Sequence, residues 1–249
     1  MALVQSSREE VVTLAIEEGV AIVTLNRPEA ANARNQAMRE RLHEIWTRLA
    51  LEESVSVVVL TGSGERFFCA GMDLKEAGEV ESAEERRVRM SAVRDIEELA
   101  ALPQPTIAAI NGYALGGGLE MALACDLRIA ASTAQLGLTE VPLGLIPGGG
   151  GTQRLPRLIG PSRAAAMIYL GARMSASESC DAGIVNECVA PHELSARTFE
   201  LARAIAGHPR HALLAAKALL TASQSLPLPE GLAVEFETLL ELMARRAVE

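Results

Sequence analysis

The chain has 249 residues, of which 49% are hydrophobic and only 3% aromatic, and it carries a formal net charge of −9 with a pI of about 5.1. It is long enough to bury a large aliphatic core, as one domain or as a domain with an appendage. The acidic balance disfavours nucleic acid as the main partner, and Asp126 and Arg128 interrupt the best candidate for a membrane span.

The cysteines and the N-terminal residues predict the compartment. No cysteine belongs to a C-x-x-C pair and no histidine cluster accompanies them, which indicates free thiols in a reducing compartment and no metal site. The first residues, MALVQSSREE, lack the basic segment and apolar core of a signal peptide. We therefore expect a cytoplasmic protein with no membrane partner. The four cysteines are Cys69, Cys125, Cys180 and Cys188.

The N-terminal half alternates strand and helix patterns. Two β-rich runs at 11–16 and 20–26 predict a hairpin. Apolar residues recur at helical spacing from Asn35 to Leu49, and His43 lies off this stripe, which predicts a surface histidine on a helix. The run VSVVVLT at 55–61 predicts a strand buried on both faces. The apolar residues of the expected helix are Met38, Leu42, Ile45, Trp46 and Leu49.

The middle of the chain repeats this alternation. The small and apolar segment 67–71 is predicted to be a loop beside a functional site. A capping box at Ser82-x-x-Glu85 predicts a helix that continues to about Leu102. Residues 106–110 predict a buried strand and residues 127–131 another strand, with a glycine-rich turn and a helix between them. Two such strand–turn–strand–helix passages indicate a repeated ββα unit in an α/β fold.

Beyond Gly160 the pattern becomes helical. Helices are expected at 161–170, after a second capping box at Ser175, and at 192–206, with two more helices after Pro209 and Pro229. We place a boundary near Pro191, between an α/β core at 1–190 and a helical region at 191–249 that packs on the core or on a neighbouring subunit.

The stretch from Pro105 to Pro156 holds ten of the chain's 20 glycines. The triplet Gly116–Gly118 precedes a predicted helix, and the N–H groups at a helix start can stabilise an anion. The triplet is not a dinucleotide-binding fingerprint, because Met121 stands where a glycine is needed. The run Gly148–Gly151 lacks the lysine of a phosphate-binding loop, and Ser63 lacks a nucleophile elbow.

Two glutamates in this stretch, Glu120 and Glu140, stand among apolar or small residues. Burial raises the pKa of a carboxyl group, and two neighbouring carboxyls push their pKa values apart. One could then hold a proton while the other acts as a base.

Four segments occur in the order that is typical of one family and are spread over residues 26–160: NRPEAANA, FCAGMDLKE, NGYALGGGLEMALACDLRIA and LGLTEVPLGLIPGGGGTQRLPRLIG. The chain resembles the enoyl-CoA hydratase/isomerase (crotonase) family. The resemblance implies an α/β spiral of repeated ββα units with a C-terminal helical appendage. It also implies an acyl-CoA thioester substrate, no cofactor beyond the coenzyme A of that substrate, and a homotrimer or a hexamer made of two trimers.

The resemblance also implies roles for single residues. The backbone N–H groups of Met72 and Gly117 would form an oxyanion hole for the thioester carbonyl. Glu120 and Glu140 would hold a water molecule and act as the acid–base pair that adds it across the 2,3 double bond. The loop around Ala30 and a second set of residues would line the coenzyme A moiety or the substrate. That set is Ala70, Asp73, Leu74, Lys75 and Gly116.

Several alternatives stay open at this stage. Both acids are present, which favours a hydratase over an isomerase, and the GGGLEMALACD wording is close to hydratases of the mitochondrial type, which include methylglutaconyl-CoA hydratase. Some proteins similar to this family bind RNA, a role that the net charge of −9 disfavours here. The chain departs from the family at its end, ARRAVE, where an aromatic and basic tail is usual, and this puts the acyl-chain preference in doubt.

Overall fold

The computed structural model describes residues 10–77 and 82–246, and its strands form a six-stranded and a four-stranded sheet. The first sheet has the order β1-β2-β3-β5-β7-β10. In this sheet β1 and β2 form the predicted antiparallel hairpin, and the remaining neighbours pair in parallel. Its strands are β1 (Val12–Glu17), β2 (Val20–Leu25), β3 (Val57–Gly62), β5 (Thr106–Ile110), β7 (Leu127–Ala131) and β10 (Glu187–Val189).

The second sheet consists of short strands in the order β4-β6-β8-β9. The first three pair in parallel, and β9 is antiparallel to β8. These strands are β4 (Phe67–Cys69), β6 (Tyr113–Leu115), β8 (Gln135–Gly137) and β9 (Arg173–Ser175).

The repeat that the sequence predicts is confirmed by how consecutive strands divide between the sheets. In each of the pairs β3–β4, β5–β6 and β7–β8, the first strand enters the six-stranded sheet and the second enters the four-stranded sheet. Helical segments follow each pair before the chain returns to the next strand. The fold is therefore a spiral of ββα units, as expected, and every turn of the spiral ends at the same edge of the small sheet.

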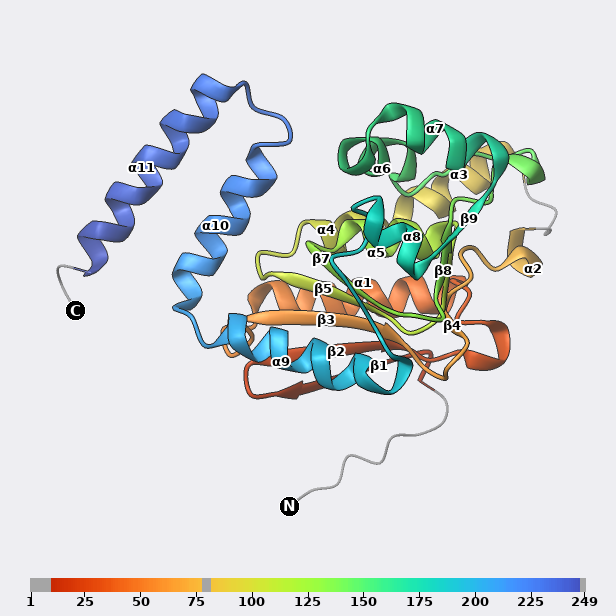
Figure 1. Cartoon of the computed structure of the whole chain (residues 1–249), viewed down its shortest axis with the longest axis horizontal. Coiled ribbons are helices and arrows are strands. Elements are labelled where there is room, and N and C mark those ends of the chain that lie inside the picture. The colour runs from red at the N-terminus through yellow and green to blue at the C-terminus, as the bar shows by residue number, and fades with distance from the viewer. Residues whose placement is uncertain (1–9, 78–81, 247–249) are drawn as a thin grey trace, which may run out of the picture.

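Helices cover both sheets and then leave them (Figure 1). The α-helices are α1 (Gln36–Leu51), α2 (Leu74–Ala77), α3 (Ala83–Ala92), α4 (Asp95–Ala100), α5 (Gly117–Ala124), α6 (Gly151–Ile159), α7 (Pro161–Leu170), α8 (Ala176–Asp181), α9 (Leu194–Ala206), α10 (Arg210–Ala222) and α11 (Leu228–Arg246). Short 3-10 helices are η1 (Pro28–Ala30), η2 (Val141–Leu143) and η3 (Pro191–Glu193). Within the described residues, no helix is long and apolar enough to cross a membrane.

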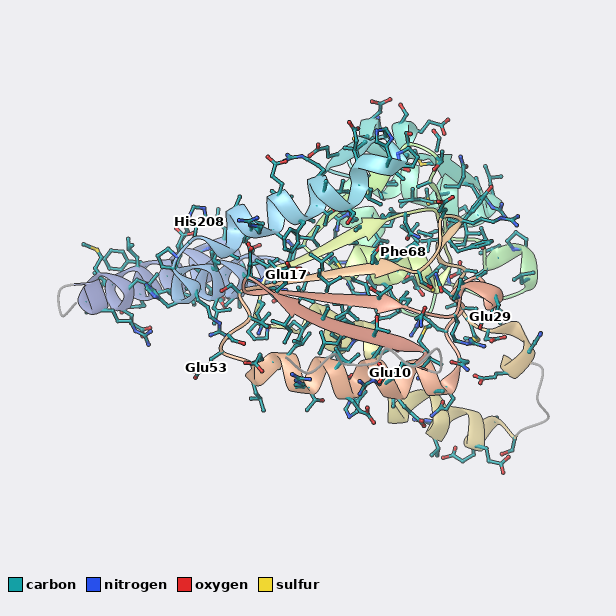
Figure 2. All side chains as sticks on the ribbon, turned by 90° about the horizontal axis from the view of Figure 1, so that it is seen from below. Glu10, Glu17, Glu29, Glu53, Phe68 and His208 are labelled. Carbon is teal, nitrogen blue, oxygen red and sulfur yellow. The ribbon has the colours of Figure 1, made fainter. Side chains whose placement is uncertain are left out.

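Helix α1 forms as its pattern predicts. The Asn35 side chain caps it by accepting a hydrogen bond from the Met38 N–H, and the apolar stripe is buried on the sheet. His43 is exposed and contacts Glu98, as expected for a residue off the stripe. Figure 2 places Phe68 inside the molecule, among the side chains between sheet and helices, and Glu53 at the periphery.

The predicted helix from Ser82 to Leu102 is wrong in one respect, because it consists of two helices. Val93 has extended dihedral angles, φ −134° and ψ 118°, which end α3, and α4 begins at Asp95. The break lets Asp95 turn inward to pair with Arg34, while Val88 on α3 is 61% exposed. The segment predicted to be only a loop contains β4, whose three residues are too few to show an alternating pattern.

The C-terminal helices divide into two groups. Helix α9 packs on the six-stranded sheet, where Leu194 and Ala202 join Val57 and Ile107 in a buried cluster. Helices α10 and α11 project from the body as an antiparallel pair, blue in Figure 1, and the view of Figure 2 shows the same projection. Although the expected helical region starts at 191, the part that stands away from the core therefore begins only after α9.

Candidate active site

The candidate site residues follow three neighbouring parallel strands of the small sheet. Met72 follows β4, Gly117 and Glu120 begin the helix after β6, and Glu140 follows β8. Because the carboxyl ends of parallel strands meet at one edge of a sheet, the ββα repeat brings together residues that are far apart in the sequence. The hydrogen bond from the Gly116 N–H to the Gly137 carbonyl, 2.8 Å long, fixes the glycine turn against the end of β8.

Glu120 lies in the first turn of α5 and is only 3% exposed. Its Oε1 accepts hydrogen bonds from the backbone N–H groups of Gly149, at 2.7 Å, and Gly151, at 2.8 Å. Burial raises the pKa of this carboxyl, and the two hydrogen bonds together with the charges of Arg34 and Arg154 act in the opposite direction. Burial is the largest of these effects, so the pKa of Glu120 is raised overall, while its hydrogen bonds and the two arginines limit the rise and fix the carboxyl in position.

Glu140 has a different environment. It precedes η2 and is half-buried, with Oε1 only 3.0 Å from the point where a Cβ on Gly116 would stand. Its Oε2 is buried and has no hydrogen-bond partner among the described residues. Burial and, to a lesser degree, the nearby charge of Glu120 raise the pKa of Glu140 to about 7. The unpartnered oxygen and the raised pKa both favour the protonated form of this carboxyl near neutral pH.

The two backbone N–H groups predicted to act together are close in space. A Cβ on Gly117 would stand 3.8 Å from the Met72 nitrogen and 3.6 Å from the Gly71 Cα. Across residues 10–77 and 82–246, neither the Met72 nor the Gly117 N–H donates a backbone hydrogen bond. Gly71 has φ +96°, a conformation that glycine adopts readily, which turns the chain directly before Met72. Two backbone donors for which no partner is recorded among the described residues therefore lie close together, next to the glycine that Glu140 contacts.

Only some of the residues expected along coenzyme A lie close together. The Ala70 N–H donates to the carbonyl of Ala31, which places the loop around Ala30 beside Ala70. Asp73 is paired with Arg27 at 3.0 Å and accepts a bond from the Lys75 N–H, so its carboxylate has partners within the chain. Lys75 is exposed, and the side chain of Leu74 lies outside the described part of the structure. Gly116 is buried against Glu140.

The sequence interpretation missed the groups that surround Glu120. Arg34 and Asp95 form a buried ion pair beside it, and the glycine run, which lacks the lysine of a phosphate loop, donates N–H groups to Glu120. Arg154 donates to the Gly149 carbonyl at 2.7 Å and thereby supports that run. A run of glycines directly before a helix, within reach of a buried acid, was the one signal that indicated Gly149. Nothing local indicated Arg34.

Two further observations concern other kinds of site. No cluster of three His, Cys, Asp or Glu side chains among the described residues could hold a metal ion. An open cavity of about 450 Å³ lies between α7, β9 and α8, where Met167, Leu170 and Met174 line it, and it includes neither glutamate. Arg163, Glu178 and Asp181 also line this cavity, but Glu178 accepts hydrogen bonds from Ser175 that lower its pKa, so we keep the Glu120–Glu140 pair as the candidate site.

Comparison with known proteins gives one consistent result. Residues 15–249 match the family model described as enoyl-CoA hydratase/isomerase. The chain is 38% identical over 226 residues to the short-chain-enoyl-CoA hydratase of Clostridium acetobutylicum, covering 91% of this chain and 87% of that protein. It is 42% identical over 223 residues to the 2,3-dehydroadipyl-CoA hydratase of Escherichia coli, covering 88% and 85% of the two. The crystal structure of an enoyl-CoA hydratase from Bacillus anthracis superposes with a TM-score of 0.90 at 44% identity, covering 94% of this chain and 91% of that one.

Proposed function

The chain belongs to the enoyl-CoA hydratase/isomerase family, and on that basis we propose that it is an enoyl-CoA hydratase that adds water to the 2,3 double bond of 2-enoyl-CoA thioesters. The product is a 3-hydroxyacyl-CoA. The observation that supports this activity best is the contrast between two neighbouring carboxyls. Glu120 is held by backbone N–H groups and faces arginines, whereas Glu140 has an unpartnered oxygen and a pKa of about 7. Such a pair can supply a base and an acid at the same pH.

In the proposed reaction the thioester oxygen binds to the N–H groups of Met72 and Gly117. These donors, together with the N-terminal end of α5, stabilise the negative charge that develops on that oxygen. Glu120 takes a proton from water while the water oxygen forms a bond to C3, and the π electrons of the double bond move into the enolate. Glu140 then delivers its proton to C2 on the same face, which restores the thioester. Proton exchange between the two carboxyls resets the pair, which titrates as a unit.

The acyl group is a separate question. The two relatives named above are a short-chain-enoyl-CoA hydratase and a 2,3-dehydroadipyl-CoA hydratase, and the chain is about equally similar to both. Leu143, Leu145 and Ile146, which lie three to six residues after Glu140, are exposed apolar residues that are suited to contact an acyl chain. We propose this segment as part of the acyl-binding surface, so that substitutions here change chain-length preference more than they change kcat on crotonyl-CoA.

We also propose that α11 joins copies of this chain into an oligomer. Four apolar side chains repeat along it at spacings of one and two turns and are between 52% and 60% exposed. Within residues 10–77 and 82–246 this helix contacts chiefly α10, which leaves the seam uncovered in a single chain. A contiguous apolar seam of this kind is typical of a protein–protein interface. The residues are Leu232, Phe236, Leu239 and Met243.

The test of the proposed activity is hydration of crotonyl-CoA, followed by loss of the conjugated enoyl-thioester absorbance. The wild type should be active, and Glu120→Gln and Glu140→Gln should each lower kcat by roughly 10²- to 10⁴-fold. An isomerase would leave crotonyl-CoA unchanged and would convert a 3-enoyl-CoA into its 2-enoyl isomer. Wild-type protein that hydrates no short, long or branched 2-enoyl-CoA would overturn the hydratase proposal. Full activity of Glu140→Gln would overturn the two-carboxyl mechanism alone.

A further inference from the structure

Arg34 reaches the candidate site from the loop before α1. Its Nε donates to Asp95 Oδ2 at 3.0 Å and its Nη2 donates to the other carboxylate oxygen, so the ion pair is bidentate. The two side chains are only 12% and 2% exposed. A planar guanidinium held at two points has one orientation, which makes its third nitrogen a fixed feature of the interior.

The backbone of Arg34 pairs with the segment that contains the first donor, the Met72 N–H. Arg34 and Met72 form an isolated parallel bridge, in which the Arg34 N–H donates to the Gly71 carbonyl at 2.7 Å and the Asp73 N–H donates to the Arg34 carbonyl at 3.1 Å. Both bonds use the neighbours of Met72 and none uses Met72 itself. The bridge therefore turns the Met72 N–H away from Arg34 and leaves it available.

The side chain of Arg34 reaches the second donor. Its Nη1 lies 2.8 Å from the point where a Cβ on Gly117 would stand, closer than the Gly71 Cα at 3.6 Å and the Met72 nitrogen at 3.8 Å. Within the described residues, no hydrogen-bond acceptor is recorded for Nη1. One residue thus contacts both halves of the proposed oxyanion hole, through its backbone at Met72 and through its guanidinium at Gly117.

The charges around Glu120 come from several elements. Arg34 lies on the loop before α1, Arg154 on α6, and Glu140 after β8, while Asp95 on α4 is engaged by Arg34. Cys69 on β4 is buried, and burial raises the pKa of its thiol to about 11, so it adds no charge. Apart from the hydrogen bonds that Glu120 accepts, the positive charges of Arg34 and Arg154 are thus what lowers its pKa.

We propose that Arg34 is a positioning residue of this site: anchored by Asp95, it keeps the Met72 and Gly117 donors in register and supplies a positive charge that faces Glu120. This inference rests on the proposed hydratase function and adds to it a residue that acts through others. It carries two separable expectations. Loss of the bidentate guanidinium should misplace the Met72 and Gly117 N–H donors. Loss of its positive charge should raise the pKa of Glu120.

The experiment compares Arg34→Gln, Arg34→Lys and Arg39→Gln with wild type, using crotonyl-CoA between pH 5 and 9. Arg34→Gln should lower kcat by about 10- to 100-fold, with KM changed less than about threefold, because donor placement acts on the transition state. The acidic limb of its kcat/KM profile should move to higher pH, because a base that is more easily protonated is lost earlier as the pH falls. Arg34→Lys keeps the positive charge but cannot make the bidentate contact with Asp95. The acidic limb of its kcat/KM profile should therefore stay in place while kcat falls.

Arg39 is the matched control, since its Nε also approaches Asp95, at 3.7 Å, but Arg39 is not among the atoms nearest to a Cβ on Gly117. If Arg34 acts only by neutralising Asp95, both glutamine variants should lose similar activity and their profiles should shift alike, and that result would overturn the proposal. Unchanged kcat in Arg34→Gln would overturn it as well. Thermal unfolding of each variant reports folding separately.

A binding measurement separates this inference from the proposed function. A cinnamoyl-CoA with a para-dimethylamino group absorbs at longer wavelength when its thioester carbonyl is polarised by hydrogen-bond donors. Wild type should shift this absorbance to the red, and Arg34→Gln should lose most of the shift. If wild type hydrates no enoyl-CoA but still gives an Arg34-dependent shift, the hydratase proposal fails and the positioning role stands. If hydration occurs and Arg34→Gln gives the same absorbance shift as wild type, only the positioning role fails.

Discussion

Glu120 and Gly149 are locked together by contact on both carboxylate oxygens. The Gly149 N–H donates to Oε1 at 2.7 Å, and a Cβ on this glycine would stand 2.8 Å from Oε2. The same Cβ would lie 2.6 Å from Ile96 Cδ1, so neither neighbour leaves space for a methyl group. Glycine is therefore needed at position 149 because of this close approach, and the acid that it holds is the proposed base.

The first prediction follows from that contact. Gly149→Ala should displace the Glu120 carboxylate and lower kcat for crotonyl-CoA by about 10²-fold, since misplacement on the scale of 1 Å has effects of this size. The adjacent Gly148→Ala is the control, because a Cβ there would meet nothing closer than the Ile146 carbonyl at 4.0 Å. Kinetics with a thermal melt for each variant would decide it. Equal activities of the two variants would contradict the role given to Gly149.

A second prediction concerns Glu140 and the pH dependence of stability. The pKa of its carboxyl is about 7 in the fold against an ordinary value of 4.5, so folding favours the protonated form, and the stability that this provides is lost as pH rises between these values. Glu140→Gln mimics the protonated form. Its melting temperature should equal that of wild type at pH 4.5 and exceed it at pH 8.

The exposed Glu178 supplies the control for that measurement. Hydrogen bonds to Ser175 lower its pKa and favour its charged form, so Glu178→Gln should give no gain at pH 8. A Glu140→Gln variant that is less stable than wild type at pH 8 would contradict the environment described for this carboxyl.

A third prediction concerns the attachment of α10. Lys217 is 6% exposed, and its Nζ donates to the Gln104 carbonyl at 2.8 Å and pairs with Asp126 at 2.9 Å. Lys217→Met should destabilise the protein by about 1.5–3 kcal/mol, the usual range for a hydrogen bond to a charged group. Asp126 keeps its bonds from Thr106, which limits the loss.

Urea unfolding measures this effect, and Arg203→Met is the comparison. Arg203 also joins a C-terminal helix to the core, through Glu18, but both side chains are more than half exposed, so the loss should stay below about 1 kcal/mol. If both substitutions cost the same, the burial of Lys217 has no special effect on stability.

A fourth prediction tests the seam on α11. Phe236→Glu places a charge in the middle of the apolar row, where Phe236 is 57% exposed in the single chain. Light scattering coupled to size exclusion should show an oligomer for wild type and a smaller species for the variant, with little change in the helical signal. Thr238→Glu adds the same charge on α11 outside the row and should leave the mass unchanged. A wild-type monomer at micromolar concentration would contradict the proposed interface.

The sequence by itself determined much of this protein. The pattern of apolar residues predicted the hairpin, α1 and the strands β3, β5 and β7. Short apolar runs are typical of buried strands, and a helical stripe buries its apolar side chains only when the segment is a helix. Capping boxes predicted the starts of α3 and α8, since a serine and a glutamate three residues later satisfy each other's backbone donors. The ordered family motifs identified Glu120 and Glu140 as the acids of interest.

Only the tertiary structure decided what surrounds those acids. The strands β4, β6 and β8 have three residues each, too few for a pattern, yet their parallel pairing places Met72, Gly117 and Glu140 at one edge of the small sheet. Asp95 reaches Arg34 because the chain breaks between α3 and α4, and helix propensities do not indicate that break. The charge on each glutamate likewise depends on burial and on partners from other elements, because a pKa is set by its neighbours in space and not by those along the chain.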